Sequence, residues 1–315
     1  MPQSDANASP VDADRLQRFM FEELDIRGAL ARLDEAWASV RGAQRYPEPV
    51  ERLLGELLTA TALLASIVKV SGTLTVQATG DGPLAALMAE CRDRSNLRGI
   101  ARIRDAKALR MEARDDAAGT GILGKGLVTI TIRPDIGDRV GEAYQGIVPL
   151  DGSSIAEALE GYFAQSEQIP TRIWLSTKGE RSAGMLIQAL PPEMAHHDHG
   201  ERRREEDFGR ITLLADTVSG SELRELPGER LLTRLFFEET VALQRPEGLA
   251  FACSCSRERT RDALRAIAEQ ELEEIIAEEG DIRMECQFCH AEYRFDRVDV
   301  AAVHASAAPD DGQVH

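Results

Sequence analysis

The sequence predicts an α+β protein in which an N-terminal domain with a largely antiparallel sheet and packed helices is followed by a helical linker and a small C-terminal four-cysteine domain. Two observations predict this class. Strand-like and helix-like segments alternate irregularly, with short turns, over residues 15–192. Four of the five cysteines then fall within residues 250–303. With 43% hydrophobic and 29% charged residues, the chain is apolar enough to build packed cores.

The first elements of the core domain are a strand and two helices. Alternating residues predict the strand over residues 16–32, and residues 34–40 then turn helical. Pro49 is suited to the first turn of a long helix that runs to Val70. Because its apolar residues leave little polar face, this helix should be buried on most sides.

The remainder of the core domain alternates strands with two helices. Residues 84–91 favour a helix, and residues 153–165 favour a second one that Ser153 or Ser154 can cap. Alternation and turn signals predict strands over residues 72–77, 97–103, 127–132, 144–150, 173–176 and 184–190.

The linker begins with residues 195–207, which carry almost no apolar side chain and predict a hydrated, charged connector. Amphipathic segments follow over residues 208–218 and 221–239, and Pro227-Gly228 delays the start of the second helix. That helix carries a cluster of apolar residues, Leu231, Leu232, Leu235, Phe236 and Phe237. A lone helix cannot bury this much apolar surface, so the cluster must pack on another part of the protein. We expect it to become exposed when the four-cysteine domain unfolds.

The C-terminal cysteines form a C-x-C pair, Cys253 and Cys255, and a C-x-x-C pair, Cys286 and Cys289. Zinc takes four thiolates at tetrahedral corners, and two close pairs supply two ligands each. In a reducing compartment, such pairs favour a shared metal over a disulfide framework or unrelated core thiols. The second pair is flanked by alternating residues that predict a hairpin, and Gly280 is suited to end the one or two helices between the pairs. We expect one zinc ion per chain.

The spacing of the pairs leaves open whether the zinc only holds the fold or also switches it. Structural zinc sites contribute on the order of 10–16 kcal/mol to folding, whereas a whole domain is stable by only about 5–15 kcal/mol. Metal loss should therefore unfold so small a unit. Because oxidants attack the thiolates that zinc needs, oxidation, metal loss and unfolding are expected to be coupled.

Composition excludes several classes of partner. The formal charge of −17 repels phosphate backbones, so nucleic acid is not an expected partner. The most apolar stretch, residues 53–70, is interrupted by Glu56 and Lys69 and is too short for a membrane span. The first residues lack a basic region and an apolar core that would direct secretion. We therefore expect a cytoplasmic protein without a membrane partner.

Three other features offer weaker candidate sites. Cys91 follows an apolar pattern and is expected to be a buried apolar residue. The cluster His196, His197 and His199 is interpreted as part of a solvated connector rather than as a metal site, because it lacks an apolar shell. His290 lies beside Cys289, but four cysteines already complete a ligand set.

Distinctive segments are spread through nearly the entire chain: "IRGALARL", "YPEPVERLLGELLTATALL", "GTLTVQATGDGP", "GLVTITI", "YQGIVPLDG", "YFAQSEQIPTR", "GMLIQALPP", "RLFFEE", "CSCSRER" and "CQFCHAEYRF". Through these segments the sequence resembles the heat shock protein 33 family, the redox-regulated bacterial chaperones. The departures are the highly charged connector and Cys91, and neither touches an expected ligand position.

The resemblance implies a holdase, a chaperone without enzymatic activity that holds unfolding or aggregating client proteins without ATP. It implies zinc on the four C-terminal cysteines in the reduced state. In the oxidised state it implies disulfides Cys253–Cys255 and Cys286–Cys289, zinc release, unfolding of the linker and zinc domain, and a homodimer. The apolar cluster of the linker is then a candidate client-binding or switch segment.

The resemblance and the composition together give the expected division of the chain. It comprises a disordered tail over 1–14, a core domain over 15–192, a charged connector and helical linker over 193–249, a zinc-binding redox-switch domain over 250–303 and a tail over 304–315.

Three other functions compete with this interpretation. A thiol-disulfide oxidoreductase would use Cys286 and Cys289 as a dithiol, but its C-x-x-C motif belongs at a helix N-terminus, whereas strands are expected here. A zinc-ribbon nucleic-acid binder is opposed by the net charge. A zinc hydrolase is opposed because four cysteine ligands leave no position for water.

Overall fold

The protein is described by a computed structural model, in which the chain forms two compact units, Met1–Ala252 and Cys253–His315. The structure describes residues 13–68, 71–112, 120–136, 139–150, 154–191, 194 and 201–305. Most residues of the two expected tails lie outside these ranges. The finer division of the chain into connector, linker and switch domain stays a prediction.

The first unit contains a six-stranded antiparallel sheet. Its order is β11-β1-β2-β10-β9, and β12 also pairs with β1. The strand expected over residues 16–32 is a hairpin rather than one strand, because the polar, acidic turn at Glu22 and Glu23 reverses the chain. The strands are β1 (Arg15–Phe21), β2 (Ile26–Leu33), β9 (Thr171–Lys178), β10 (Arg181–Ala189), β11 (Val241–Leu243) and β12 (Glu247–Gly248).

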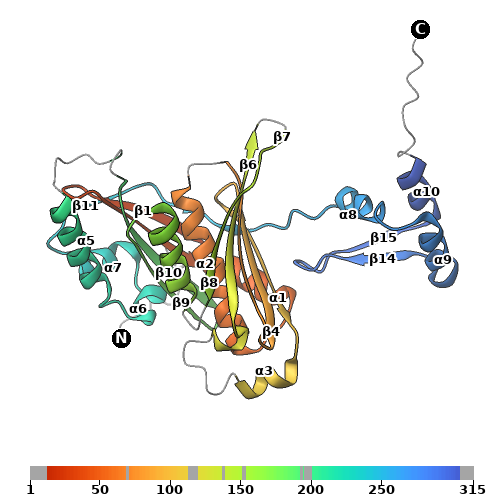
Figure 1. Cartoon of the computed structure of the whole chain (residues 1–315), viewed down its shortest axis with the longest axis horizontal. Coiled ribbons are helices and arrows are strands. Elements are labelled where there is room, and N and C mark those ends of the chain that lie inside the picture. Colours follow the sequence, from red (N-terminus) through yellow and green to blue (C-terminus); the bar gives the residue numbers. More distant parts are fainter. Residues whose placement is uncertain are drawn as a thin grey trace, which may run out of the picture. The chain divides into compact units, whose positions relative to one another are not determined.

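A seven-stranded sheet forms the other half of this unit (Figure 1). Its order is β13-β5-β4-β3-β6-β7, with β8 paired to β6, and only the β13–β5 pair is parallel. The strands are β3 (Gly72–Gly80), β4 (Leu84–Arg92), β5 (Asn96–Ile103), β6 (Gly126–Ile136), β7 (Arg139–Val140), β8 (Tyr144–Leu150) and β13 (Ala250–Phe251). The expected α+β class with a largely antiparallel sheet is confirmed.

The prediction of a helix over residues 84–91 is wrong, because this segment is the central strand β4. Its Ala, Leu, Met and Glu residues favour helices intrinsically, but that preference is weak. Leu87, Ala89 and Cys91 are buried in alternation with partly exposed neighbours, which is the period of a strand. Pairing with β3 on one side and β5 on the other decides the outcome.

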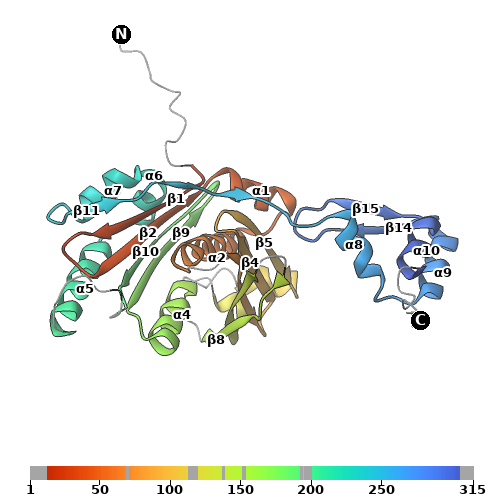
Figure 2. The same cartoon turned by 90° about the horizontal axis from the view of Figure 1, so that it is seen from above.

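The core of the first unit lies between the two sheets and is filled by α2 (Glu48–Ile67), as Figure 2 shows. The helix is buried on most sides, as the sequence predicts. The expected helix over residues 34–40 is α1 (Glu35–Ala43), and that over 153–165 is α4 (Ile155–Tyr162) continued by a π-helix (Phe163–Glu167). Ser154 caps α4 in a capping box with Glu157. The short α3 (Ala106–Glu112) and a 3₁₀ turn (Gly121–Leu123) complete this part.

Three linker helices cover the outer face of the six-stranded sheet, the face opposite α2 (Figures 1 and 2). They are α5 (Glu201–Ala215), α6 (Gly220–Glu225) and α7 (Gly228–Leu235). The expected connector is therefore wrong over residues 201–207, which are helical. Ion pairs between successive turns, such as Arg202–Glu206 at 3.0 Å, support a helix even where apolar residues are scarce. The cluster His196, His197 and His199 lies outside the described residues.

The second unit is a small helical and hairpin domain. As expected, a hairpin of β14 (Ile282–Glu285) and β15 (Glu292–Phe295) follows two helices, α8 (Arg257–Leu264) and α9 (Glu269–Glu279). The last helix, α10 (Arg297–Ala305), completes it. Its core is small, with seven buried apolar residues: Leu264, Leu272, Ile276, Ile282, Phe295, Val300 and Val303. Within the described ranges, the chain has no helix with the length and apolar character that crossing a membrane requires.

Candidate metal centre

The four C-terminal cysteines meet in the second unit, where their sulfur atoms all lie within 4.8 Å of one another. Two of the sulfur contacts join the pairs: Cys253 to Cys286 at 3.6 Å and Cys255 to Cys289 at 3.3 Å. Tetrahedral zinc with bonds of about 2.3 Å to sulfur separates its ligands by about 3.8 Å. The arrangement therefore fits one metal ion held by four half-buried thiolates.

The C-x-C pair lies in extended chain immediately before α8. Ser256 caps that helix by accepting a hydrogen bond from the backbone N–H of Arg259 at 3.2 Å. The Arg259 guanidinium reaches back and donates to the Ser254 carbonyl oxygen at 2.8 Å. These contacts fix the chain on both sides of Cys255.

The C-x-x-C pair lies in the turn between β14 and β15. The backbone N–H of Cys286 donates to the Ala291 carbonyl at 3.0 Å, and that of His290 donates to the Cys286 carbonyl at 2.8 Å. His290 has a left-handed backbone, with φ of +56°, which closes the turn. Both thiols are thereby presented on one side of the hairpin tip.

A hydroxyl group that sequence analysis missed completes the surroundings of the thiols. The Tyr293 hydroxyl donates to the Cys255 sulfur at 3.1 Å. Tyr293 is the second residue of β15. The alternation of residues along this predicted strand was the signal from which the direction of the Tyr293 side chain could have been inferred. Hydrogen bonds to a ligating sulfur orient it and lower its electron density.

The electrostatics of the cluster favour a bound cation. Burial, opposed by a hydrogen bond from the Ala291 backbone and reinforced by the three neighbouring thiols, raises the pKa of the Cys289 thiol to about 12. Four thiolates this close repel one another when no positive charge lies among them. A divalent metal supplies that charge, so the site is suited to metal binding.

His290 does not join the cluster. Its imidazole contacts the carboxylate of Glu285 instead, and the four-sulfur group is the one cluster of potential metal ligands in the described part of the chain.

The packing around the centre is thin. Arg257 joins α8 to the rest of the unit, because its guanidinium pairs with Asp299 at 2.7 Å and lies 4.7 Å from the ring centroid of Phe295. The cluster of seven buried apolar residues is the main other contribution. A metal ion bound by the four sulfur atoms would add directly to the folding energy of a unit with so small a core.

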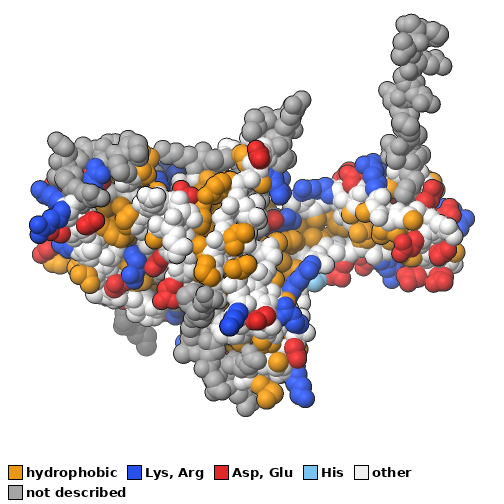
Figure 3. Space-filling view, viewed as in Figure 1, with side chains coloured by type: hydrophobic (Ala, Val, Ile, Leu, Met, Phe, Trp, Pro, Cys, Tyr) orange, Lys and Arg blue, Asp and Glu red, His pale blue; other side chains and the backbone are white. Residues whose placement is uncertain are grey.

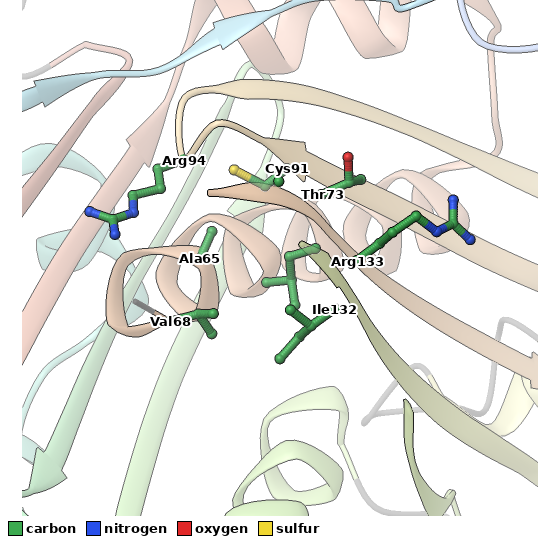
Figure 4. Close-up of a pocket in the computed structure, with 9 residues that line it drawn as sticks. Ala65, Val68, Thr73, Cys91, Arg94, Ile132 and Arg133 are labelled. Atoms are coloured by element: carbon green, nitrogen blue, oxygen red, sulfur yellow. The ribbon is translucent and has the colours of Figure 1, made fainter. Parts of the chain in front are cut away.

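Cys91 belongs to the other unit, Met1–Ala252, where it lies on β4. Figure 4 shows it with Ala65, Val68 and Ile132 around a hollow of about 10 Å³. Its side chain is buried, and burial together with the charge of Asp93 raises the pKa of the thiol to about 12. The expectation of a buried apolar residue is confirmed.

The apolar cluster of the linker packs on the first unit. Leu231, Leu232, Leu235 and Phe236 are buried against the outer face of the six-stranded sheet, in the first unit. Phe237 is 75% exposed. The prediction that all five residues are covered until the cysteine domain unfolds is therefore wrong for Phe237. The other four make their apolar contacts within the first unit.

Comparisons with known proteins agree with this architecture. A family model described as Hsp33 protein matches residues 14–296. The 33 kDa chaperonin of Ectopseudomonas mendocina is 43% identical over 295 residues, which cover 93% of this chain and 96% of the relative. That of an Enterobacter species is 40% identical over 306 residues, or 96% and 99% of the two chains.

One similar solved structure is the crystal structure of the 33 kDa chaperonin, a heat shock protein 33 homologue, of Thermotoga maritima. It superposes with a TM-score of 0.75 at 21% identity and covers 93% of this chain and 98% of that one. At this identity the likeness shows a shared fold.

Proposed function

This chain belongs to the Hsp33 family, and on that premise we propose that it is a redox-regulated, ATP-independent holdase that binds unfolding proteins in the cytoplasm under oxidative stress. The observation that carries the proposal is the convergence of four thiols, from two distant pairs, on one point of a unit with a small core.

In the reduced state, Cys253, Cys255, Cys286 and Cys289 hold one zinc ion. Thiolate sulfur is the donor that zinc prefers in closed structural sites, and the sulfur separations match tetrahedral coordination. Zinc supplies the positive charge that keeps four thiolates together. The small core around it then remains folded.

Oxidation reverses this arrangement. Each pair, Cys253–Cys255 and Cys286–Cys289, forms a disulfide by giving two electrons to peroxide or hypochlorite. A disulfide sulfur is a poor ligand, so zinc leaves as its four bonds are lost. Without zinc the second unit loses most of its folding energy.

The connection to the linker runs through β13, the last strand of the first unit. Ala250 and Phe251 pair in parallel with β5, and the Ala252 N–H donates to the Leu97 carbonyl at 3.0 Å. Cys253 is the next residue. Unfolding of the second unit therefore disturbs this short β13–β5 pairing first, and the linker helices α5 to α7 loosen afterwards.

Client proteins have apolar side chains available even on the folded first unit. Leu127, Tyr144 and Ile147 are each at least 47% exposed on β6 and β8, and Figure 3 shows apolar side chains over the face where these strands lie. Release of the linker adds the apolar surface beneath α7. Client binding and formation of a homodimer both bury such surface.

The alternative, a thiol-disulfide oxidoreductase using Cys286 and Cys289, is less well supported. The two thiols lie in a turn between strands rather than at a helix N-terminus, so no helix dipole activates either sulfur as a nucleophile. Both also contact the other pair.

The test follows zinc release and chaperone activity together. The reduced, zinc-loaded chain is treated with hypochlorite while metal release and light scattering by a heat-denatured client are recorded. We expect suppression of scattering to appear with zinc loss and to reverse on reduction with zinc. Mass spectrometry should place the disulfides within the pairs. Suppression that is equal in the reduced form would contradict the redox switch, and catalytic turnover of disulfide substrates would favour the oxidoreductase.

A further inference from the structure

The first unit contains a cavity of about 220 Å³ at one end of the layer that holds α2. We propose that it binds an aliphatic chain ending in a carboxylate, of the size of a medium-chain fatty acid. The cavity is lined mainly by apolar side chains, among them Leu64, Ile67, Leu74, Ile130, Ile132 and Phe163. Small-molecule sites have this character, with a few fixed polar groups among apolar walls.

The polar group that selects the ligand is Arg27, on β2. Its guanidinium is partly buried at the cavity wall and donates through Nε and Nη2 to the Gln188 side-chain oxygen, at 3.1 and 2.6 Å. Its three other N–H donors make no hydrogen bond to the residues that the structure describes. Among the described residues, no carboxylate lies within 4.0 Å of it. An anion entering the cavity would therefore meet a cation that lacks an acidic partner.

Arg27 is held in place by buried neighbours. Gln188 is 1% exposed, and its amide nitrogen donates to the Thr171 hydroxyl at 2.9 Å. That hydroxyl donates in turn to the Ile169 carbonyl at 3.0 Å. The relay fixes the guanidinium at the cavity instead of letting it turn to solvent. Burial lowers the pKa of Arg27, which shows that its charge is poorly compensated.

Glu167 is the acidic residue on the cavity wall, and its carboxylate bonds to tyrosine hydroxyls instead of to Arg27. Its carboxylate accepts a hydrogen bond from the Tyr162 hydroxyl at 2.8 Å and a longer one from Tyr144 at 3.4 Å. Glu167 closes the π-helix Phe163–Glu167, and Gln168 after it is left-handed with φ of +55°. Such π-turns are rare and frequently occur at functional sites.

The alternatives fit the cavity less well. A nucleotide is too large and too polar for about 220 Å³ of mainly apolar space. An alkyl ammonium would be repelled by Arg27, and an uncharged alkane would leave its donors unpaired. A carboxylate pairs with guanidinium through two parallel hydrogen bonds, and the alkyl chain fills the apolar space.

The experiment titrates the reduced, zinc-loaded full chain with octanoate, octanol and octylamine below their aggregation limits, using calorimetry. We expect one octanoate per chain, bound at least tenfold more tightly than octanol or octylamine. Zinc retention and an unchanged near-ultraviolet circular dichroism spectrum show that the chain has stayed folded. This comparison of headgroups needs no variant.

Two variants and a control locate the site. Arg27→Met should weaken octanoate binding at least tenfold and leave octanol binding unchanged, and Val68→Phe, which fills the cavity, should abolish both. Arg245→Met removes an exposed arginine from the loop between β11 and β12 and should change neither. The proposal is overturned by non-saturable binding, by equal affinity for the three headgroups, or by unchanged binding in a folded Arg27→Met or Val68→Phe protein. These readouts are independent of the redox switch.

Discussion

The rings of Phe21 and Phe236 pack edge to face, with their centroids 5.0 Å apart and their planes at 82°. Phe21 ends β1 and Phe236 follows α7, so this contact fastens the end of the linker to the outer face of the six-stranded sheet. Phe19 extends the cluster, with its ring 5.9 Å from that of Phe21. The linker is thus held by the first unit's own core.

Truncation of the adjacent residues Phe236 and Phe237 should change the free energy of unfolding by very different amounts. Phe236→Ala removes a ring that is 1% exposed and should lower the free energy of unfolding of the first unit by about 3–5 kcal/mol. Phe237→Ala removes a ring that is 75% exposed and should change it by less than about 0.5 kcal/mol. Urea unfolding monitored by circular dichroism measures both. Equal losses would mean that Phe236 is not anchored as the structure shows.

Replacement of one of the four cysteines should remove both the bound metal and the folded structure of the second unit. Cys289→Ser should reduce the zinc content far below one ion per chain and remove amide hydrogen-exchange protection from β14, β15 and α9, because the proposed zinc site would couple metal binding to folding. Cys91→Ala is the matched control and should retain zinc. Metal analysis and hydrogen exchange check both variants, and a protected second unit without zinc would refute the coupling.

Two glycines should respond in opposite directions to alanine. Gly280 ends α9 with φ of +87°, a conformation that costs an L-residue about 1–2 kcal/mol, so Gly280→Ala should destabilise the second unit by that amount. Gly209 lies within α5 with open space around its Cβ position, and Gly209→Ala should stabilise the first unit by about 0.5–1 kcal/mol. Thermal unfolding of the two units, followed separately, would detect the opposite shifts.

Glu56 on α2 should make stability depend on pH. Burial, partly offset by Arg52, raises its pKa from 4.5 to about 7. The folded state therefore holds this proton more tightly than the unfolded state, and stability falls as pH rises from about 4.5 to about 7. At pH 8 the ionised Glu56 lowers the free energy of unfolding by up to about 3 kcal/mol, and Glu56→Gln should restore that amount. At pH 4 the substitution should have little effect.

The control for this pH effect is Glu48→Gln, at the exposed start of the same helix. It should leave the pH profile of stability unchanged. Urea unfolding at several pH values gives both profiles, and parallel profiles for wild type and Glu56→Gln would contradict the assignment.

Local patterns in the sequence predicted much of the fold because strong periodicity and turn chemistry act over few residues. The apolar run of α2 and the Ser154 cap of α4 are of this kind. The β4 segment was missed because its residues favour a helix by small increments, whereas its two neighbouring strands are distant in sequence.

The sequence by itself determined the set of four thiols, because a C-x-C motif and a C-x-x-C motif within a predicted hairpin favour a shared metal. Only the tertiary structure decided where the linker packs, how Tyr293 meets Cys255, and that Arg27 lies against an apolar cavity. These contacts join residues far apart in the chain, and no local pattern encodes them. They arise when the sheets and helices stack, since burial then selects which faces meet.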